Sequence, residues 1–126
     1  MSNVGHVELH VGSLGVVYGV RCSDGSCPAE EFLAGLDARA QAQFMARFER
    51  LADGHGLISP DQYRQLHVAG LPVIWEIKVH AGPGWRLYGV PIKRDWIATH
   101  GVRRPKDKAI AKEVKRSRTI FLDWER

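Results

Sequence analysis

Three short segments in the C-terminal half of the chain alternate apolar with polar residues, and this pattern restricts the fold more than any other feature. The segments cover about residues 73–80, 85–92 and 95–102. Alternation with a period of two, rich in β-branched and aromatic residues, is typical of strands. The segments are separated by short turn sequences, residues 81–84 with Gly and Pro, and residues 93–95. The pattern therefore predicts three consecutive antiparallel strands.

The N-terminal half carries the pattern of one strand and two helices. Residues 14–21 are β-branched and aromatic and are predicted to form a first strand. Pro28 is suited to the start of a short helix, and Asp37 to the N-cap of a second one. The apolar residues that repeat at helical spacing in this second helix are Ala40, Phe44, Phe48 and Leu51. Residues 28–53 are therefore expected to form a helical hairpin with one apolar face.

The remaining segments complete the predicted order of elements. Ser59-Pro60-Asp61-Gln62 resembles a capping box and predicts a short helical turn that ends near Leu66. A last helix is expected from about Lys106, with an apolar face made of Ile110, Val114, Phe121 and Trp124. The order strand, two helices, three strands and helix predicts an α+β fold, in which the helices pack on an antiparallel sheet.

The length of the chain favours one domain. A chain of 126 residues fits a single compact unit over residues 1–126. Residues 1–13 are of mixed character, and we expect them to form an N-terminal extension or an edge strand.

The charge of the chain is distributed unevenly. Residues 1–63 carry 4 Lys/Arg and 8 Asp/Glu, whereas residues 64–126 carry 14 Lys/Arg and 6 Asp/Glu, for a total of +4. A basic half on one folded domain favours an anionic partner such as nucleic acid. The alternative is a basic surface that is merely solvated, which is common in small basic proteins.

The sequence gives no sign of a metal site, a leader or a membrane span. Cys22 and Cys27 lie five residues apart. His6 and His10 could form a second pair of ligands, but no second pair of cysteines supports a metal site. Since structural zinc sites need four ligands, usually in two close pairs, we expect two free thiols. No apolar run approaches the ~18 residues of a membrane span, and a secretory signal pattern is absent. The expectation is a cytoplasmic protein with no cofactor, no metal and no membrane contact.

Several motifs in the C-terminal half occur in a recognisable order. They are Trp75-Glu76-Ile77-Lys78, Arg86-Leu87-Tyr88, His100-Gly101-Val102-Arg103-Arg104, Pro105 and Ala111-Lys112-Glu113. In this order they resemble the RelE/ParE superfamily of type II toxins, and most closely its HigB-like, phage-derived branch. Residues 31–33 and 47–51 also fit the helical hairpin of that family. The resemblance covers about residues 14–118, and the ordered set is more specific than any single motif.

This resemblance implies a fold, a partner and an activity. The fold is a small microbial-RNase-like (RelE-like) α+β domain with a concave, positive face. The partner is a cognate antitoxin of the helix-turn-helix type, encoded alongside and covering that face. RNase members of the superfamily cut mRNA, commonly on the ribosome, whereas ParE members poison DNA gyrase on the same scaffold. The leading expectation is an mRNA endoribonuclease that inhibits translation. The alternatives are a gyrase poison and a non-catalytic, phage-derived module that binds RNA or a protein.

The chemistry of RNA cleavage through the 2′-OH selects the candidate catalytic residues. It needs a group that takes the 2′ proton, cations that neutralise the phosphorane, and a donor for the 5′ leaving oxygen. Arg86 matches the strand arginine of the family, and its guanidinium fork fits phosphate oxygens, so we expect it to stabilise the transition state. Lys78 is expected to be a phosphate cation or a lysine base of lowered pKa. Its alternative role is a surface pair with Glu76.

Two further candidates lie at the end of the last strand. His100 is the one imidazole at a strand end beside predicted cations, which suits acid or base catalysis near neutral pH. A capping or structural histidine is the alternative. Arg104 lies just beyond the strand and is expected to hold the substrate phosphate or to offset charge on the leaving group. A basic loop that flanks the helix is the alternative there.

Other residues are candidates for nucleic-acid binding. They are Arg103, Lys106, Lys108, Lys112 and Trp85. The cations would contact the phosphate backbone and give salt-dependent affinity. Trp85 is a candidate for stacking on a base, with a place in the core as the alternative.

The chain departs from the RelE pattern in one respect that bears on mechanism. RelE members carry a catalytic tyrosine in or near the last helix, and residues 106–126 contain no tyrosine. HigB-like members also lack it, so this departure favours their branch and leaves the general acid unassigned.

Overall fold

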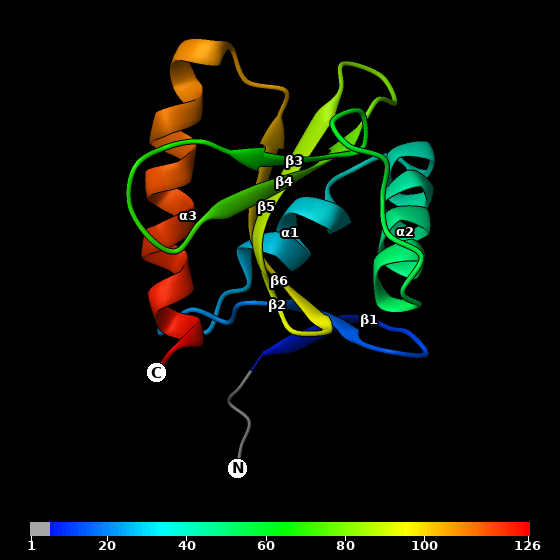
Figure 1. The fold of residues 1–126 in the computed structure, drawn as a ribbon, viewed down its shortest axis with the longest axis horizontal. Helices are drawn as coiled ribbons and strands as arrows, with labels where there is room; N and C mark the ends of the chain where they lie inside the picture. Colours follow the sequence, from blue (N-terminus) through cyan, green and yellow to red (C-terminus); the bar gives the residue numbers. More distant parts are fainter. Residues whose placement is uncertain (1–5) are drawn as a thin grey trace.

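A six-stranded sheet in the order β1-β2-β6-β5-β4-β3 organises residues 6–126, which are the residues that the computed structural model describes (Figure 1). The strands are β1 (Val7–Val11), β2 (Val16–Gly19), β3 (Tyr63–Leu66), β4 (Ile74–Val79), β5 (Trp85–Ile92) and β6 (Asp95–Arg103). The helices are α1 (Pro28–Ala34), α2 (Ala38–Ala52) and α3 (Ile110–Trp124), and a 3₁₀ turn, η1 (Asp107–Ala109), precedes α3. The chain is therefore a small α+β fold, as its pattern predicts.

The sheet is mixed rather than antiparallel, which corrects the expected topology. β2 pairs with β6 in parallel, and every other neighbouring pair of strands is antiparallel. The reason lies in the connection: the chain passes through α1, α2 and three further strands before β6 forms beside β2. Parallel strands require such a long crossover, whereas short turns join antiparallel neighbours.

Helices cover both faces of the sheet. Figure 1 shows α3 on the left of the sheet and α2 on the right. One buried cluster lies between the sheet and α1 and α2; its larger members are Phe44, Phe48, Ile77, Leu87 and Trp96. A second cluster lies between the sheet and α3; its larger members are Leu66, Ile74, Tyr88, Ile97 and Phe121. Because side chains alternate along a strand, each central strand contributes to both clusters.

The helical hairpin forms as its sequence predicts. Pro28 occupies the start of α1, and the Asp37 side chain caps α2 by accepting a hydrogen bond from the Ala40 backbone N–H at 2.9 Å. The expected face of α2 is confirmed, since Ala40, Phe44 and Phe48 are buried and Leu51 packs against the same cluster. In α3 the expected apolar face also lies against the sheet.

The predicted helical turn is limited to residues 58–62, where the Gln62 backbone N–H donates to the Ile58 carbonyl at 2.7 Å, and Tyr63–Leu66 form strand β3 instead of continuing the turn. Gln62 makes a local turn with Ile58, whose N–H donates to the Gln62 side chain at 3.1 Å. From Tyr63 onward the backbone pairs with β4, and the Tyr63 ring stacks on Trp75 with centroids 4.7 Å apart. Cross-strand packing therefore overrides the local capping signal.

The N-terminal segment contributes an edge strand. β1 pairs with β2 only, so residues 7–11 belong to the sheet rather than to an extension outside it. Residues 1–5 of the expected extension lie outside the described part of the chain. Among residues 6–126, no helix has the length and apolar character needed to cross a bilayer.

Gly101 allows α1 to approach β6 closely. A Cβ at this position would lie 2.2 Å from Cδ2 of Phe32. Gly101→Ala is therefore expected to lower the free energy of unfolding by about 1–3 kcal/mol, because the added methyl group must displace an aromatic ring. Urea denaturation measures this change. Gly35→Ala is the control, since a Cβ there makes only ordinary contacts at 3.6 Å. Equal stability of the two variants would contradict the prediction.

Candidate functional site

Four side chains form a polar row across the sheet on the face that α3 covers. The row consists of Arg64 on β3, Glu76 on β4, Tyr88 on β5 and His100 on β6. Each residue pairs directly with the next in the strand register. This placement brings polar groups from four strands into a largely apolar interface, where they require partners.

Glu76 is at the centre of the charged part of this row. Its side chain is 1% exposed, and its Oε2 accepts from Nε of Arg64 at 2.6 Å and lies 2.5 Å from Nη2. Its Oε1 lies 3.5 Å from Nε of Arg86. A carboxylate buried to this degree is tolerated because two guanidinium groups compensate its charge.

Two more cations join this cluster around a small pocket, which we call the phosphate pocket. Its volume is about 90 Å³, and its lining residues are Arg64, Glu76, Lys78, Arg86, Arg104, Pro105, Asp107 and Ile110. Lys78 and Arg86 pair across β4 and β5, and the Arg104 backbone N–H donates to the Gly84 carbonyl at 2.9 Å. Four cationic side chains face two carboxylates, so the pocket has a surplus of positive charge that suits an anion.

The pKa values of two cations reflect this crowding. Burial lowers the pKa of Arg86, with Glu76 opposing and Arg104 adding to the shift. Burial also lowers the pKa of Lys78, and nearby Arg64 and Arg86 lower it further. A phosphate bound between these groups would relieve their mutual repulsion. The arrangement therefore suits an anion such as a phosphate, and before an anion binds, Lys78 releases its proton more readily than usual.

His100 lies on the same sheet face but behind the phosphate pocket. Its side chain is 1% exposed, and Nε2 is 2.9 Å from Oε1 of Glu113 on α3. Its ring stacks on Tyr88 with centroids 5.0 Å apart, and burial lowers its pKa. This placement corresponds to the structural alternative for His100, because the imidazole joins α3 to the sheet and does not line the pocket.

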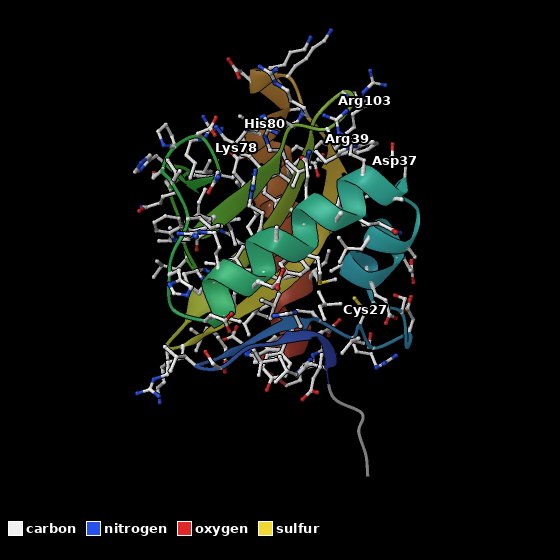
Figure 2. All side chains as sticks on the ribbon, turned by 90° about the vertical axis from the view of Figure 1, so that its right-hand side faces the viewer. Cys27, Asp37, Arg39, Lys78, His80 and Arg103 are labelled. Atoms are coloured by element: carbon white, nitrogen blue, oxygen red, sulfur yellow. The ribbon has the colours of Figure 1, made fainter. Side chains whose placement is uncertain are left out.

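Trp85 and Arg103 lie on the opposite face of the sheet from Arg86. They pair across β5 and β6, and the Trp85 ring packs edge-on against Phe32 of α1 with centroids 6.0 Å apart. Arg103 is exposed, and Figure 2 shows it at the same end of the molecule as Lys78. The structure therefore separates these two candidates from the phosphate pocket, and Trp85 occupies the core position that was its alternative.

The predicted lysine contacts lie on the surface around η1 and α3. Lys106 occupies the N-cap position of η1 without a hydrogen bond from its side chain, and Lys106, Lys108 and Lys112 are all exposed. Asp107 and Ile110, between them in sequence, line the pocket, so this basic segment begins at its rim.

Sequence reasoning missed Arg64 and the role of Glu76. The sequence pattern does not select Arg64, because it predicts a helical turn through Leu66 in place of strand β3. The available signal was Glu76 itself, since an acidic residue inside an apolar strand requires a cationic partner when it is buried. The partner of Glu76 lies on a neighbouring strand, and the residues next to Glu76 in the sequence do not indicate which strand that is.

The described residues hold no group of three or more His, Cys, Asp or Glu side chains arranged for a metal ion, and both cysteines are free thiols. Comparisons with protein-family models, with curated proteins and with solved structures gave no match to this chain.

Proposed function

We propose that this chain is an endoribonuclease toxin of the RelE/HigB-like class, which cuts mRNA in the cytoplasm and is neutralised by a cognate antitoxin. The observation that carries the proposal is the convergence of Arg64, Lys78, Arg86 and Arg104 on one pocket. The motif order of the sequence supports the same class. Cations fixed on strands hold a phosphate in a defined orientation. Catalysis requires such an orientation, whereas simple electrostatic attraction to a basic surface does not.

The residues of the pocket would supply the base and the charge stabilisation for 2′-OH transesterification. As the 2′ oxygen bonds to phosphorus, the bond from phosphorus to the 5′ oxygen breaks, and the released 5′ oxygen would take its proton from water. Arg86 and Arg104 would hold the non-bridging oxygens and offset the charge that builds up in the phosphorane. Lys78, as a neutral amine, would take the 2′ proton. Glu76 would orient Arg64 and Arg86 through the contacts to its two oxygens. His100 would act only through its support of α3, since it is buried behind the pocket.

The proposed role of Lys78 predicts a particular pH dependence. Because the neutral amine is the reactive form, kcat/KM should rise with pH and level off above the lowered pKa of Lys78 in the free protein. Lys78→Arg keeps the positive charge but does not lose its proton in the accessible range. We expect this variant to retain RNA binding and to lose the alkaline rise in kcat/KM. Identical pH profiles for the variant and the wild type would exclude Lys78 as the base.

Induction of the protein in bacteria tests the function as a whole. We expect the wild type to arrest growth and to fragment mRNA, and Arg86→Ala to do neither. Arg94→Ala is the control, because Arg94 is an exposed arginine in the turn between β5 and β6, outside the phosphate pocket. Growth arrest with intact RNA and trapped DNA breaks would indicate the gyrase alternative. RNA binding without cleavage, even at high protein concentration, would indicate the non-catalytic alternative.

A further inference from the structure

A second hollow adjoins the phosphate pocket and shares two of its residues. Its volume is about 190 Å³, and its lining residues are Arg64, Gln65, Leu66, His67, Val68 and Ile110. Arg64 and Ile110 line both spaces, so a ligand in one lies beside a ligand in the other. We call this second space the β3 hollow.

The chemistry of the β3 hollow differs from that of the phosphate pocket. Leu66 is buried, Val68 and Ile110 pack against the apolar cluster under α3, and the His67 ring is exposed. Arg64 uses Nε and Nη2 for Glu76, which leaves Nη1 for another partner, and its side chain is 40% exposed. Nucleobases stack on apolar and aromatic side chains, and the free Nη1 of a guanidinium can donate a hydrogen bond to the edge of a base.

A side chain of α3 holds the segment that follows β3 and forms one wall of the β3 hollow. The Arg118 guanidinium donates four hydrogen bonds of 2.7–3.0 Å to the carbonyls of Val68, Ala69, Gly70 and Pro72. Gly70 adopts a φ of +115°, and a Cβ there would lie 2.7 Å from Nη1 of Arg118. The segment after β3 is thus held in one conformation before any ligand binds, which lowers the entropic cost of recognition.

We propose that the β3 hollow binds the nucleobase of the nucleotide whose phosphate lies in the phosphate pocket. This inference rests on the proposed function, because its occupant is identified by continuity with the phosphate. His67, Val68 and Ile110 then set the base preference, and Arg118 is a positioning residue that acts through residues 68–72. The preference of cleavage for one base over another is therefore determined on β3 and the start of α3.

Equilibrium binding of small ligands tests this inference without cleavage. The probes are the four ribonucleoside 3′-monophosphates, the corresponding abasic ribose phosphate and inorganic phosphate, titrated into the full chain by NMR. We expect at least one nucleotide to bind the wild type about 5- to 150-fold more tightly than the abasic compound, which corresponds to the stacking of one base.

Three variants separate the base contact from other effects. Val68→Ala should bring the ratio of nucleotide to abasic affinity close to one, while inorganic phosphate binds as in the wild type, because Val68 lines the β3 hollow but not the phosphate pocket. His67→Ala should lower the ratio without disturbing the core, because its side chain is exposed. Leu122→Ala, an exposed apolar residue farther along α3, should keep the wild-type ratio.

The possible failures are distinguishable. Equal affinity of the wild type for nucleotides and the abasic compound, with phosphate binding intact, would overturn the base site and leave the proposed function standing. Unchanged ratios in both Val68→Ala and His67→Ala would do the same. Absence of phosphate binding and of RNA cleavage in the wild type would overturn the proposed function, and this inference with it.

Discussion

Replacing Arg86 by alanine is expected to lower the rate of RNA cleavage by about 10²- to 10³-fold, the usual effect of removing one fixed group that stabilises transition-state charge. Arg86 is expected to act strongly because it is held in place before substrate binds. Its Nε lies 3.5 Å from Glu76, and its Nη1 donates to the Trp85 carbonyl at 3.1 Å. The measurement is single-turnover cleavage of a short RNA by the wild type and the variant.

Matched variants separate the geometry of Arg86 from its charge. Arg86→Lys keeps the positive charge but loses the planar fork, so it should recover only part of the rate. Arg94→Ala removes an arginine outside the pocket and should cleave like the wild type. Thermal unfolding of each variant shows whether the fold persists. A folded Arg86→Ala protein with wild-type kinetics would remove the basis of the proposed mechanism.

Replacing Arg118 by alanine is expected to lower the free energy of unfolding by about 2–4 kcal/mol. The side chain satisfies four carbonyls in the segment between β3 and β4. A hydrogen bond from a charged donor contributes about 1.5–3 kcal/mol. Two of the four contacts are exposed, so water can replace them, and the estimate stays below the full sum. Urea denaturation followed by tryptophan fluorescence gives the change in midpoint.

Two controls test whether the network of Arg118 causes this effect. Arg116→Ala removes an exposed arginine two residues earlier on α3 and should change stability by less than about 0.5 kcal/mol. Arg118→Lys keeps the charge but cannot reach four carbonyls from one plane, so it should lie between the wild type and Arg118→Ala. Equal stability of Arg116→Ala and Arg118→Ala would show that the segment does not depend on the guanidinium.

The fold could be predicted from the sequence wherever local pattern and tertiary environment agree. The strands β4, β5 and β6 alternate clearly, and Phe44 and Phe48 mark the buried face of α2, so these elements were predicted near their observed bounds. β3 was missed because its start resembles a helix cap, while its strand conformation depends on pairing with β4. The parallel pairing of β2 with β6 joins segments about 80 residues apart, and no local pattern carries that information.

The candidate site was predictable only in part for the same reason. Arg86, Lys78 and Arg104 could be selected by residue type and by position on a strand or at its end, and the structure brings them to one pocket. His100 has a suitable residue type, but its burial under α3 depends on a contact with Glu113 that sequence spacing does not indicate. Trp85 and Arg103 lie on the opposite face of the sheet from Arg86. This placement could be predicted from the sequence, because successive side chains of a strand alternate between its two faces.

The position of β6 between β2 and β5 has a consequence for the order of events during synthesis. Residues 7–19 have no sheet to join until residues 95–103 leave the ribosome, because β6 is the strand that connects them to the rest. Pairing β2 with β6 closes a long loop in the chain, which costs conformational entropy. We therefore expect this edge of the sheet to assemble late in folding. Before β6 is synthesised, the hairpin of β1 and β2 has only α1 and α2 to pack against, so this edge joins the sheet after the strands β3 to β5 have been made.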